Sequence, residues 1–456
     1  ISQWERQIEY FSETANVLAV DLVGCGDSEV VAGWKPYTTD SILQDLVTLL
    51  TTRYRSSSTI LIAHSYGCTF ACLLAIHPSV CSQVRAVVLI APKSHITPAE
   101  KKNMRVLRWC PDWFIDGLRI SDRKGGINSK SVKRLLGEQA EEDLRRRQLR
   151  WNLMSRTSVW RRTVVGMRIP GKEEWEQIRV PVLLVGGKED KIVPNQDMFI
   201  IRDWLLHSPL NNLVAKENID TASASPSSSP NTQLLPHVRV PIPYIIRNAG
   251  HQVMLEKPEL VNPIISEEFL IKTCGFEVMS PAWQILHKTQ GENKWDLKNF
   301  EKIMRQNDPE HSPAAFIAQH PEIGYIIDFS HESPPYRPSD FDGSNIRYIK
   351  LSTLSKIPPA REDVTYFIER VRDCWRERPE AHVAVHCHYG FNRTGFVICC
   401  YLIQELGVSV SDALRYFAEA RPPGIRHTHF KDELFLRYAL PERSETGDTE
   451  DRDRRQ

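Results

Sequence analysis

The sequence predicts two consecutive α/β domains, each built on a mostly parallel sheet. The first observation is that short apolar runs alternate with longer helix-like segments, as parallel strands joined by crossover helices require. The second is that this alternation ends with a helical stretch at residues 258–273 and then starts again. The third is the length of 456 residues, too long for one ordinary hydrophobic core. The apolar runs of the first alternation lie at residues 17–20, 60–63, 86–91, 182–185 and 244–246.

The first domain is predicted to span residues 1–273. Between residues 97 and 177 the pattern changes to stretches rich in Arg, Glu and Trp, so we expect helices that cover the sheet as a cap. Residues 217–236, which include TASASPSSSPNTQ, carry almost no apolar side chains. This composition predicts a disordered surface insertion.

The second domain is predicted to span residues 294–440, after a linker at residues 274–293. Residues 441–456 are dense in charge and lack apolar anchors, which predicts a disordered tail. Within the domain we expect strands at residues 324–328 and 346–351, a helix at residues 361–378, and a strand at residues 383–385 that runs directly into a glycine-containing loop.

Composition limits the possible partners and compartments. The formal net charge of +1 favours neither a broad polyanion-binding surface nor an acidic solubilising tract. The ten cysteines form no C-x-x-C pair, which argues against a disulfide framework and a structural zinc site. A reducing, intracellular location in the cytoplasm or nucleus fits this pattern. We expect no cofactor. No apolar run has the length of a membrane span. Because the chain begins with Ile1 in what looks like the interior of a domain, the sequence leaves an upstream targeting segment open.

The segment VAVHCHYGFNRTG carries the strongest chemical signal in the chain. A buried strand is expected to end at Cys387 and a helix to begin near Arg393. In such a turn successive backbone N–H groups converge on one point, and the amino end of the helix adds positive potential, which makes a cradle for a phosphate dianion. The N–H groups are those of His388, Tyr389, Gly390, Phe391, Asn392 and Arg393.

The same electric field favours the Cys387 thiolate, which predicts a nucleophile at neutral pH. Arg393 is predicted to hold two phosphoryl oxygens with its guanidinium. Thr394 is a candidate donor to the Cys387 sulfur, and His386 a candidate for fixing the loop. The alternative interpretation is an ordinary buried cysteine at a strand end, which the combination of His, Cys, Gly, Arg and Thr at these spacings makes much less favourable.

This loop matches the signature of the protein tyrosine and dual-specificity phosphatases. The stretches IIDFSHESPPY, NIRYIKL, HCHYGFNRTGFVICCYLI and ARPPGIRHTHFKDELFLRY resemble the RNA 5′-triphosphatase domain of metazoan-type mRNA capping enzymes and its free-standing relatives. The similarity runs from about residue 294 to residue 438. It implies a phosphatase fold with a five-stranded sheet, no metal, and substrates that carry phosphate esters or 5′-triphosphates.

One departure from the protein tyrosine phosphatases concerns the general acid. Those enzymes carry an aspartate on a loop upstream of the cysteine, whereas this chain has STLSKIPPARED, with Lys356 in the expected loop and Glu362 and Asp363 at a helix start, where they are also explained as caps. A positioned acid contributes about 10² to 10⁴ in rate when the leaving group is a poor one. A nucleoside diphosphate leaves without a proton, so the missing aspartate favours a triphosphate substrate.

Three hypotheses therefore stand for the second domain. The leading one is a cysteine phosphatase that acts on an RNA 5′ end, the second is a protein tyrosine or dual-specificity phosphatase that acts on a phosphoprotein, and the third is a pseudoenzyme that binds phosphorylated partners or RNA ends. Arg421, Arg426 and Lys431 are candidates for a basic rim that holds further phosphates, although a solvated loop at a helix start explains them equally well.

In the first domain, ILIAHSYG is similar to the nucleophile elbow G-x-S-x-G, with Ser65 as nucleophile and Ala63 in place of the first glycine. Asp190 follows the run VPVLLVGG, and His251 follows the next run. The order Ser, Asp, His after successive strands, together with DLVGCGDS at residues 21–28, resembles the α/β-hydrolase superfamily over residues 4–273.

In this interpretation His251 takes the proton of Ser65, Asp190 holds the histidine tautomer, and the Tyr66 backbone N–H is one oxyanion donor. The resemblance implies a second donor from a loop, usually marked by His-Gly, that would lie upstream of Trp4. Losing one oxyanion donor costs about 10² to 10³ in turnover, so we expect doubtful esterase activity from the chain as it stands. The sequence leaves ester, amide and lipid substrates open.

Overall fold

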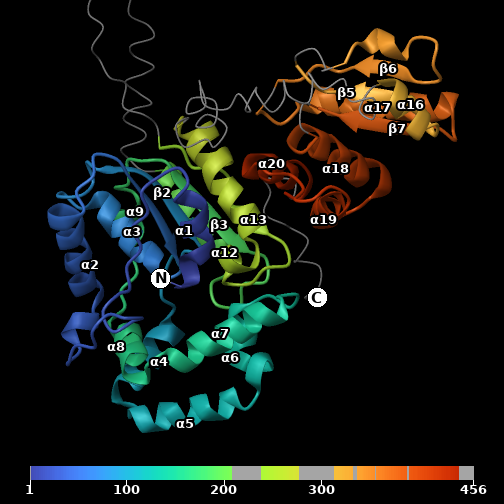
Figure 1. Ribbon diagram of the computed structural model, residues 1–456. Coiled ribbons are helices and arrows are strands. Elements are labelled where there is room, and N and C mark those ends of the chain that lie inside the picture. Colours follow the sequence, from blue (N-terminus) through green and yellow to red (C-terminus); the bar gives the residue numbers. More distant parts are fainter. Residues whose placement is uncertain are drawn as a thin grey trace, which may run out of the picture. The chain divides into compact units, whose positions relative to one another are not determined.

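The computed structural model describes residues 2–207, 238–276, 313–331, 336–354, 356–387 and 390–440. These residues form two compact units, one up to Phe276 and the other from Pro313 to Leu440 (Figure 1). The predicted insertion at residues 217–236, the predicted tail at residues 441–456 and nearly all of the predicted linker lie outside the described residues, as do residues 294–312. The predicted domain boundaries therefore stay predictions.

The first unit contains a parallel sheet in the order β1-β2-β3-β4. The side chains of β3 are buried throughout, as expected for a strand covered on both faces. Leu61 of β1 pairs with Val87 of β2, and Val185 of β3 pairs with Tyr244 of β4. The strands are β1 (Thr59–His64), β2 (Val84–Ile90), β3 (Val182–Gly187) and β4 (Tyr244–Ile246).

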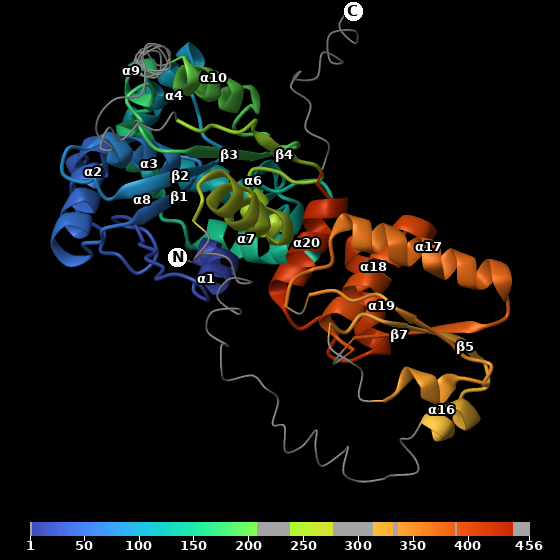
Figure 2. The ribbon, with the colours of Figure 1, turned by 90° about the horizontal axis from the view of Figure 1, so that it is seen from above.

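Helices cover both faces of this sheet (Figure 2). On one face lie α2 (Thr39–Thr48), α3 (Gly67–Ile76), α9 (Lys172–Trp175) and α10 (Gln196–Leu206), and on the other α1 (Glu5–Phe11), α12 (Val253–Glu256) and α13 (Pro258–Pro263). Short 3-10 and π-helical segments are η1 (Ser2–Trp4), η2 (Lys35–Tyr37), η3 (Leu49–Arg53), η4 (Gly126–Asn128) and η5 (Ile264–Thr273).

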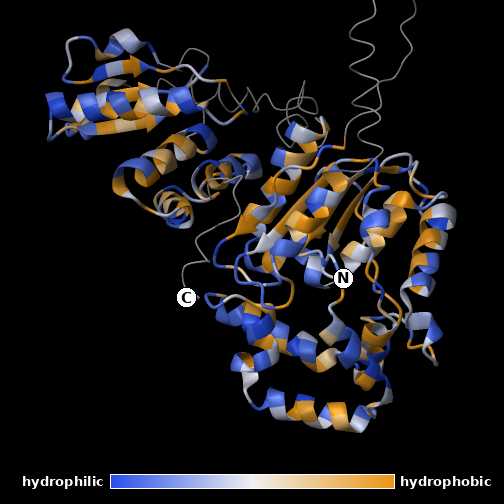
Figure 3. Ribbon diagram, turned by 180° about the vertical axis from the view of Figure 1, so that it is seen from behind, coloured by the Kyte–Doolittle hydropathy of each residue, from blue (hydrophilic) through white to orange (hydrophobic). Residues whose placement is uncertain are grey.

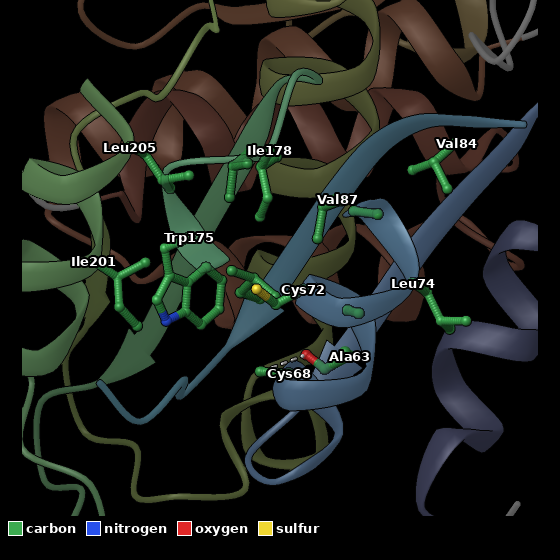
Figure 4. Packing of buried hydrophobic residues seen from close by; sticks show 14 of the residues in the cluster. Ala63, Cys68, Cys72, Leu74, Val84, Val87, Trp175, Ile178, Ile201 and Leu205 are labelled. Atoms are coloured by element: carbon green, nitrogen blue, oxygen red, sulfur yellow. Dashed lines mark hydrogen bonds between the residues drawn. The ribbon is translucent and has the colours of Figure 1, made fainter. Parts of the chain in front are cut away.

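The core of the first unit packs around the contact between Trp175 and the helix that follows β1 (Figure 4). Trp175 and Cys72 are almost completely buried, and Val87 lies in the same cluster. The Cys68 thiol contacts the Ala63 carbonyl oxygen at 3.4 Å, which places α3 directly against the end of β1. This packing holds the start of α3, and with it the turn at Ser65, against the sheet.

The segment predicted as a cap, residues 97–177, contains a series of helices at the carboxyl-terminal edge of the sheet. Thr97 begins the series with a reciprocal capping box to Glu100. The helices ahead of α9 are α4 (Pro98–Trp109), α5 (Asp112–Arg123), α6 (Lys130–Leu135), α7 (Glu142–Met154) and α8 (Thr157–Gly166).

One local expectation for the first unit is wrong. Residues 17–20 form no strand, and Val17, Leu18 and Val20 are half-exposed. Apolar β-branched residues favour a strand only where a neighbouring strand supplies backbone hydrogen-bond partners. Among the described residues, β1 pairs only with β2. The helical stretch at 258–273 is continuous but changes to π-helix after Pro263, which has no N–H to donate within the helix.

The second unit has a parallel sheet in the order β6-β5-β7. The described residues thus contribute three strands, where the family resemblance implied five. The strands are β5 (Ile323–Asp328), β6 (Arg347–Lys350) and β7 (His382–His386). The helices are α16 (Pro313–Gln319), η8 (Pro338–Phe341), α17 (Arg361–Glu377), α18 (Asn392–Leu406), α19 (Val410–Ala420) and α20 (Thr428–Tyr438).

The two faces of this sheet pack differently. The face toward α17 to α20 forms one large cluster that contains Ile327, Phe396 and Phe430. The other face forms a small cluster around Ile326 and Phe341. Because all three strands run parallel, the residues that follow β5, β6 and β7 meet at one edge, and Cys387 lies there.

Candidate active sites

Ser65 lies at the sharp turn between β1 and α3. Its φ of +54° is in the left-handed region, which a non-glycine residue rarely adopts, and its N–H donates to the Ile90 carbonyl oxygen at 2.8 Å. Gly67 lies so close to the strand that a Cβ on it would contact the Ala63 Cβ at 3.8 Å. The turn thus has the geometry of a nucleophile elbow, and Ala63 is small enough for it.

The side chains of Ser65, Asp190 and His251 form a hydrogen-bonded chain. His251 Nε2 lies 2.9 Å from Ser65 Oγ, and His251 Nδ1 lies 2.8 Å from Asp190 Oδ2. The other carboxylate oxygen of Asp190 accepts the N–H groups of Ile192 and Val193 at 2.7 and 2.9 Å. This arrangement can remove a proton from Ser65 and stabilise the imidazolium that results.

The electrostatics of these groups agree with that chemistry. Burial alone would raise the pKa of Asp190, but its hydrogen bonds with His251 and with two backbone N–H groups outweigh burial and lower the pKa. Asp190 is therefore charged at neutral pH. Tyr66 is the N-cap residue of α3, where backbone N–H groups have no partner within the helix, and a role for its N–H as an oxyanion donor stays a prediction.

The sequence interpretation missed His64, which packs directly against His251. Its Nε2 lies 2.8 Å from the His251 carbonyl oxygen, and the two ring centroids are 4.7 Å apart. Burial and the neighbouring His251 lower the pKa of His64 to about 3. His64 is thus neutral and donates to His251. The sequence feature that pointed to His64 was its position directly before Ser65.

A second unexpected feature is the link between the cap and the His251 loop. Glu256 accepts the N–H of Gly137 at 2.7 Å with one carboxylate oxygen and the N–H of Gly250 at 2.8 Å with the other. Gln252 N–H donates to the Leu135 carbonyl oxygen at 3.0 Å. A cap segment that lies more than a hundred residues upstream therefore fixes the backbone on both sides of His251.

In the second unit, Cys387 directly follows β7 and is buried, with 7% of its surface exposed. The helix α18 begins at Asn392, five residues later, and Gly390 between them has a φ of +69°, which favours glycine. His388 and Tyr389 lie outside the described residues, so their predicted N–H contacts remain predictions.

Arg393 is buried on the first turn of α18. Its Nη1 donates to the carbonyl oxygens of Phe329 and Thr353 at 2.7 and 2.8 Å. These bonds fix the guanidinium while leaving Nε and Nη2 for a phosphoryl group. Thr394 is also buried, and its hydroxyl has no hydrogen-bond partner among the described residues, so the predicted donation to the Cys387 sulfur is not made in this structure.

Beneath the loop lies a polar cluster around Asp328, the last residue of β5, which the sequence interpretation missed. Its carboxylate is completely buried and accepts Tyr348 Oη at 2.6 Å, Lys350 Nζ at 2.7 Å, and the Ser330 N–H and hydroxyl at 2.7 and 2.6 Å. Burial raises the pKa of Asp328, but Lys350, Ser330 and Tyr348 together lower it. The cluster is thus a satisfied buried anion at the base of the site.

His386, the last residue of β7, connects this cluster to the loop. Its Nε2 lies 2.5 Å from Tyr336 Oη, and its Nδ1 lies 3.2 Å from the Cys387 carbonyl oxygen and 3.6 Å from Asp328 Oδ1. The side chain therefore holds the strand end immediately before Cys387, which is the position expected for a residue that fixes the loop.

Two of the three predicted rim residues lie beside the loop. The guanidinium groups of Arg426 and Arg421 stack on the Phe391 ring, at 3.9 and 4.7 Å from its centroid. Asn392 Oδ1 accepts the N–H groups of Arg426 and His427 at 2.8 and 3.0 Å, which attaches this loop to the start of α18. The third predicted residue, Lys431, lies half-buried on α20, and a rim role for it stays a prediction.

Comparison with known proteins identifies both units. A model described as the alpha/beta hydrolase fold matches residues 1–223, and one described as the dual specificity phosphatase catalytic domain matches residues 305–438. The tyrosine-protein phosphatase of Autographa californica nuclear polyhedrosis virus is 32% identical over 120 residues, which are 26% of this chain and 71% of that protein. The chain contains a domain of the dual-specificity phosphatase family joined to an α/β hydrolase domain. The predicted fold class and both family resemblances are confirmed.

Two further relatives each match only part of this chain. The mRNA-capping enzyme of Danio rerio is 36% identical over 131 residues, 28% of this chain, and the chain spans only 21% of that enzyme. The abhydrolase domain-containing protein C57A10.08c of Schizosaccharomyces pombe is 27% identical over 241 residues, 51% of this chain and 64% of that protein. Among the described residues, no helix is long and apolar enough to cross a membrane.

Proposed function

We propose that the phosphatase domain removes the terminal phosphate from a 5′-triphosphate end, with RNA as the substrate class. The observation that carries the proposal is the pair of exposed cations, Arg421 and Arg426, stacked on Phe391 of the Cys387 loop. A Cβ built on Gly390 would lie 3.9 Å from Arg421 Nη2, so this cation lies immediately beside the loop. The Cys387 loop would take the only phosphate of a phosphate monoester. A triphosphate has two further phosphates for Arg421 and Arg426 to bind.

The loop that carries the general acid in tyrosine phosphatases has a lysine here. His429 Nε2 donates to the Lys356 carbonyl oxygen at 2.9 Å. Burial lowers the pKa of His427, and the charges of Lys356 and Arg426 lower it further. Lys356, His427 and Arg426 therefore lie in one neighbourhood. A cationic side chain at this position suits an anionic leaving group and cannot supply a proton as readily as a carboxylic acid.

The reaction follows from these positions. The Cys387 thiolate attacks the terminal phosphorus, the sulfur–phosphorus bond forms, and the bond to the bridging oxygen breaks with its electron pair leaving on the diphosphate end. Arg393 follows the charge on the equatorial oxygens through Nε and Nη2. Water then hydrolyses the phosphocysteine, releasing inorganic phosphate and regenerating the thiolate. Relatives named mRNA-capping enzyme support this choice of substrate.

The test compares phosphate release from triphosphate-ended RNA, a phosphotyrosine peptide and an aryl phosphate. We expect the RNA to be preferred and Cys387→Ser to abolish release from all three. Arg421→Ala with Arg426→Ala should raise KM for the RNA about tenfold or more and leave the aryl phosphate unaffected. The matched control is Arg415→Ala, since Arg415 also stacks on an aromatic ring, Tyr416, but on α19. A preference for the phosphopeptide would contradict the proposal.

For the other domain we propose a serine hydrolase, because the hydrogen bonds from Asp190 through His251 to Ser65 are already formed. A fluorophosphonate probe should label Ser65 in the wild type and fail to label Ser65→Ala. His251→Ala should also prevent labelling, since it removes the base. Equal labelling of wild type and His251→Ala would show that Ser65 is not activated by this triad.

A further inference from the structure

The helices α4 and α5, at the outer end of the cap of the hydrolase domain, carry exposed apolar side chains. Figure 3 colours the hydrophobic residues of α5 orange. Trp109 and Trp113 are 86% and 74% exposed, and Val106, Phe114, Leu118 and Ile120 are also exposed. We call these six residues the outer cap face. Figure 1 draws α5 at the end of the cap that lies farthest from the sheet. The outer cap face thus places six exposed apolar side chains on two consecutive helices, which is unusual for a surface that meets only water.

The helix α5 turns its aromatic side to solvent, whereas a normal surface helix buries its apolar side. With 100° per residue, Trp113, Phe114 and Ile120 project from one side, and Ile115, Arg119 and Asp122 from the other. The side that carries Ile115, Arg119 and Asp122 faces the protein, while the side with the aromatic residues faces outward. A surface helix of a soluble domain normally buries its apolar side, so the orientation of α5 is not explained by stability of the hydrolase domain alone.

The inward orientation is held by specific bonds. Arg119 donates to the Thr157 hydroxyl at 2.6 Å and to the Asn152 and Ser155 carbonyl oxygens at 3.0 and 2.8 Å. Asp112 forms an ion pair with Arg161 at 2.7 Å, and Asp116 accepts the Thr157 hydroxyl. These bonds would have to break for α5 to rotate its apolar side inward. The exposed aromatic side chains are therefore a fixed feature of the fold.

Charge around the outer cap face is predominantly positive. Between Pro98 and Lys124 the sequence has seven cationic and four acidic residues. The acids are engaged locally: Glu100 binds Lys93 at 3.0 Å, and Asp122 accepts the Ser131 N–H at 3.3 Å, in addition to the bonds of Asp112 and Asp116. The cations Lys101, Lys102, Arg105 and Lys124 are exposed.

We propose that the outer cap face docks onto an anionic lipid surface. Exposed tryptophan and phenylalanine beside lysine and arginine are the composition of helices that lie in the plane of a membrane interface, where the rings insert at the headgroup level and the cations attract acidic lipids. The charge complementarity favours an acidic lipid leaflet over a second copy of this chain, because two identical cationic faces would repel. The proposal is independent of what either domain hydrolyses.

The test measures co-sedimentation of the full chain with vesicles of phosphatidylcholine alone and with phosphatidylserine added. We expect binding to the acidic vesicles, weakening with salt, and quenching of tryptophan fluorescence by lipids brominated on the acyl chain. Trp109→Ser with Trp113→Ser should lower the partition coefficient about tenfold or more. Lys101→Glu with Lys102→Glu should remove the preference for phosphatidylserine.

A matched pair of single variants separates docking from general surface hydrophobicity. Leu118 on the outer cap face and Leu406 at the end of α18 are 59% and 61% exposed. Leu118→Ser should weaken vesicle binding, whereas Leu406→Ser should leave it unchanged. Two outcomes overturn the proposal: vesicle binding that is absent or is unchanged in the double tryptophan variant, and a concentration-dependent dimer, lost in that variant, from a chain that binds no vesicles.

Discussion

At the scale of single residues, His429 gives the phosphatase domain a specific response to acid. The side chain is 4% exposed, its Nε2 donates to the Lys356 carbonyl oxygen, and its Nδ1 has no partner among the described residues. A proton on Nδ1 would therefore be buried without an acceptor. Burial and the neighbouring His427 lower the pKa of His429 to about 4, although the bond to Lys356 opposes the shift.

The sign of the pH effect follows from this pKa. Above pH 6.5, the ordinary value for histidine, His429 is neutral in both the folded and unfolded states. As the pH falls toward 4, the unfolded state takes up the proton first, so the free energy of unfolding decreases, by up to roughly 3 kcal/mol. We expect His429→Gln, which keeps a donor for Lys356 and does not titrate, to flatten this decrease.

The measurement is the free energy of unfolding of the phosphatase domain in urea, at a series of pH values between about 4 and 7.5. The control is His382→Gln, because His382 is exposed and should contribute little. If His429→Gln showed the same pH dependence as the wild type, the acid response would have to come from other groups.

The sequence predicted residues that can be selected from their own position in the chain, and it missed residues whose role depends on which strands become neighbours. Ser65, Asp190 and His251 each follow an apolar run, and their chain order was enough to select them. Asp328 also ends an apolar run, but its partners Tyr348 and Lys350 are on β6. The cluster exists because β5 pairs with β6 in one register, and apolar periodicity carries no information on which strands become neighbours.

At the scale of secondary-structure elements, the position of His251 depends on the close approach of two loops. A Cβ on Gly250 would lie 2.6 Å from the Gly137 nitrogen and 2.7 Å from the Leu136 carbonyl carbon, both backbone atoms that cannot easily move aside. Glycine is therefore required at position 250 by the approach of the cap segment. The sequence showed Gly250 before His251, but not the cap segment that needs it.

We predict that Gly250→Ala will displace the His251 loop and slow fluorophosphonate labelling of Ser65 about 10²-fold, the usual cost of a misplacement of about 1 Å. Far-ultraviolet circular dichroism should show an unchanged sheet, because the substitution is outside β3 and β4. Gly117→Ala is the matched control, since a Cβ at Gly117 would contact nothing within 4 Å. Normal labelling of Gly250→Ala would mean that the cap contact does not position His251.

The strand expected at residues 17–20 shows the limit of prediction at this scale. The run has the composition of the strands that did form, yet its side chains are half-exposed. By contrast, β2 has the same composition and lies between β1 and β3, where both of its edges are paired. A local pattern predicts the tendency to form a strand, while the hydrogen-bonded neighbours decide whether the strand forms.

At the scale of the whole molecule, each unit has its own sheet and its own hydrophobic core. The cluster around Trp175 draws its members from the hydrolase unit, and the clusters around Phe396 and Phe341 draw theirs from the phosphatase unit. Units with separate cores generally unfold as separate cooperative transitions. The described residues therefore predict two transitions in calorimetry of the full chain.

Ligands provide the way to assign these transitions. The proposed phosphate site of the Cys387 loop exists only in the folded state. We therefore expect inorganic phosphate, at a concentration 100 times its Kd, to stabilise the phosphatase domain by about 2.7 kcal/mol and to raise the Tm of one transition. A fluorophosphonate adduct on Ser65 should change only the other transition. Arg393→Ala should abolish the phosphate effect and leave the adduct effect intact, because Arg393 lies in the phosphatase unit. A single transition that responds to both ligands would show instead that the two domains unfold as one cooperative body.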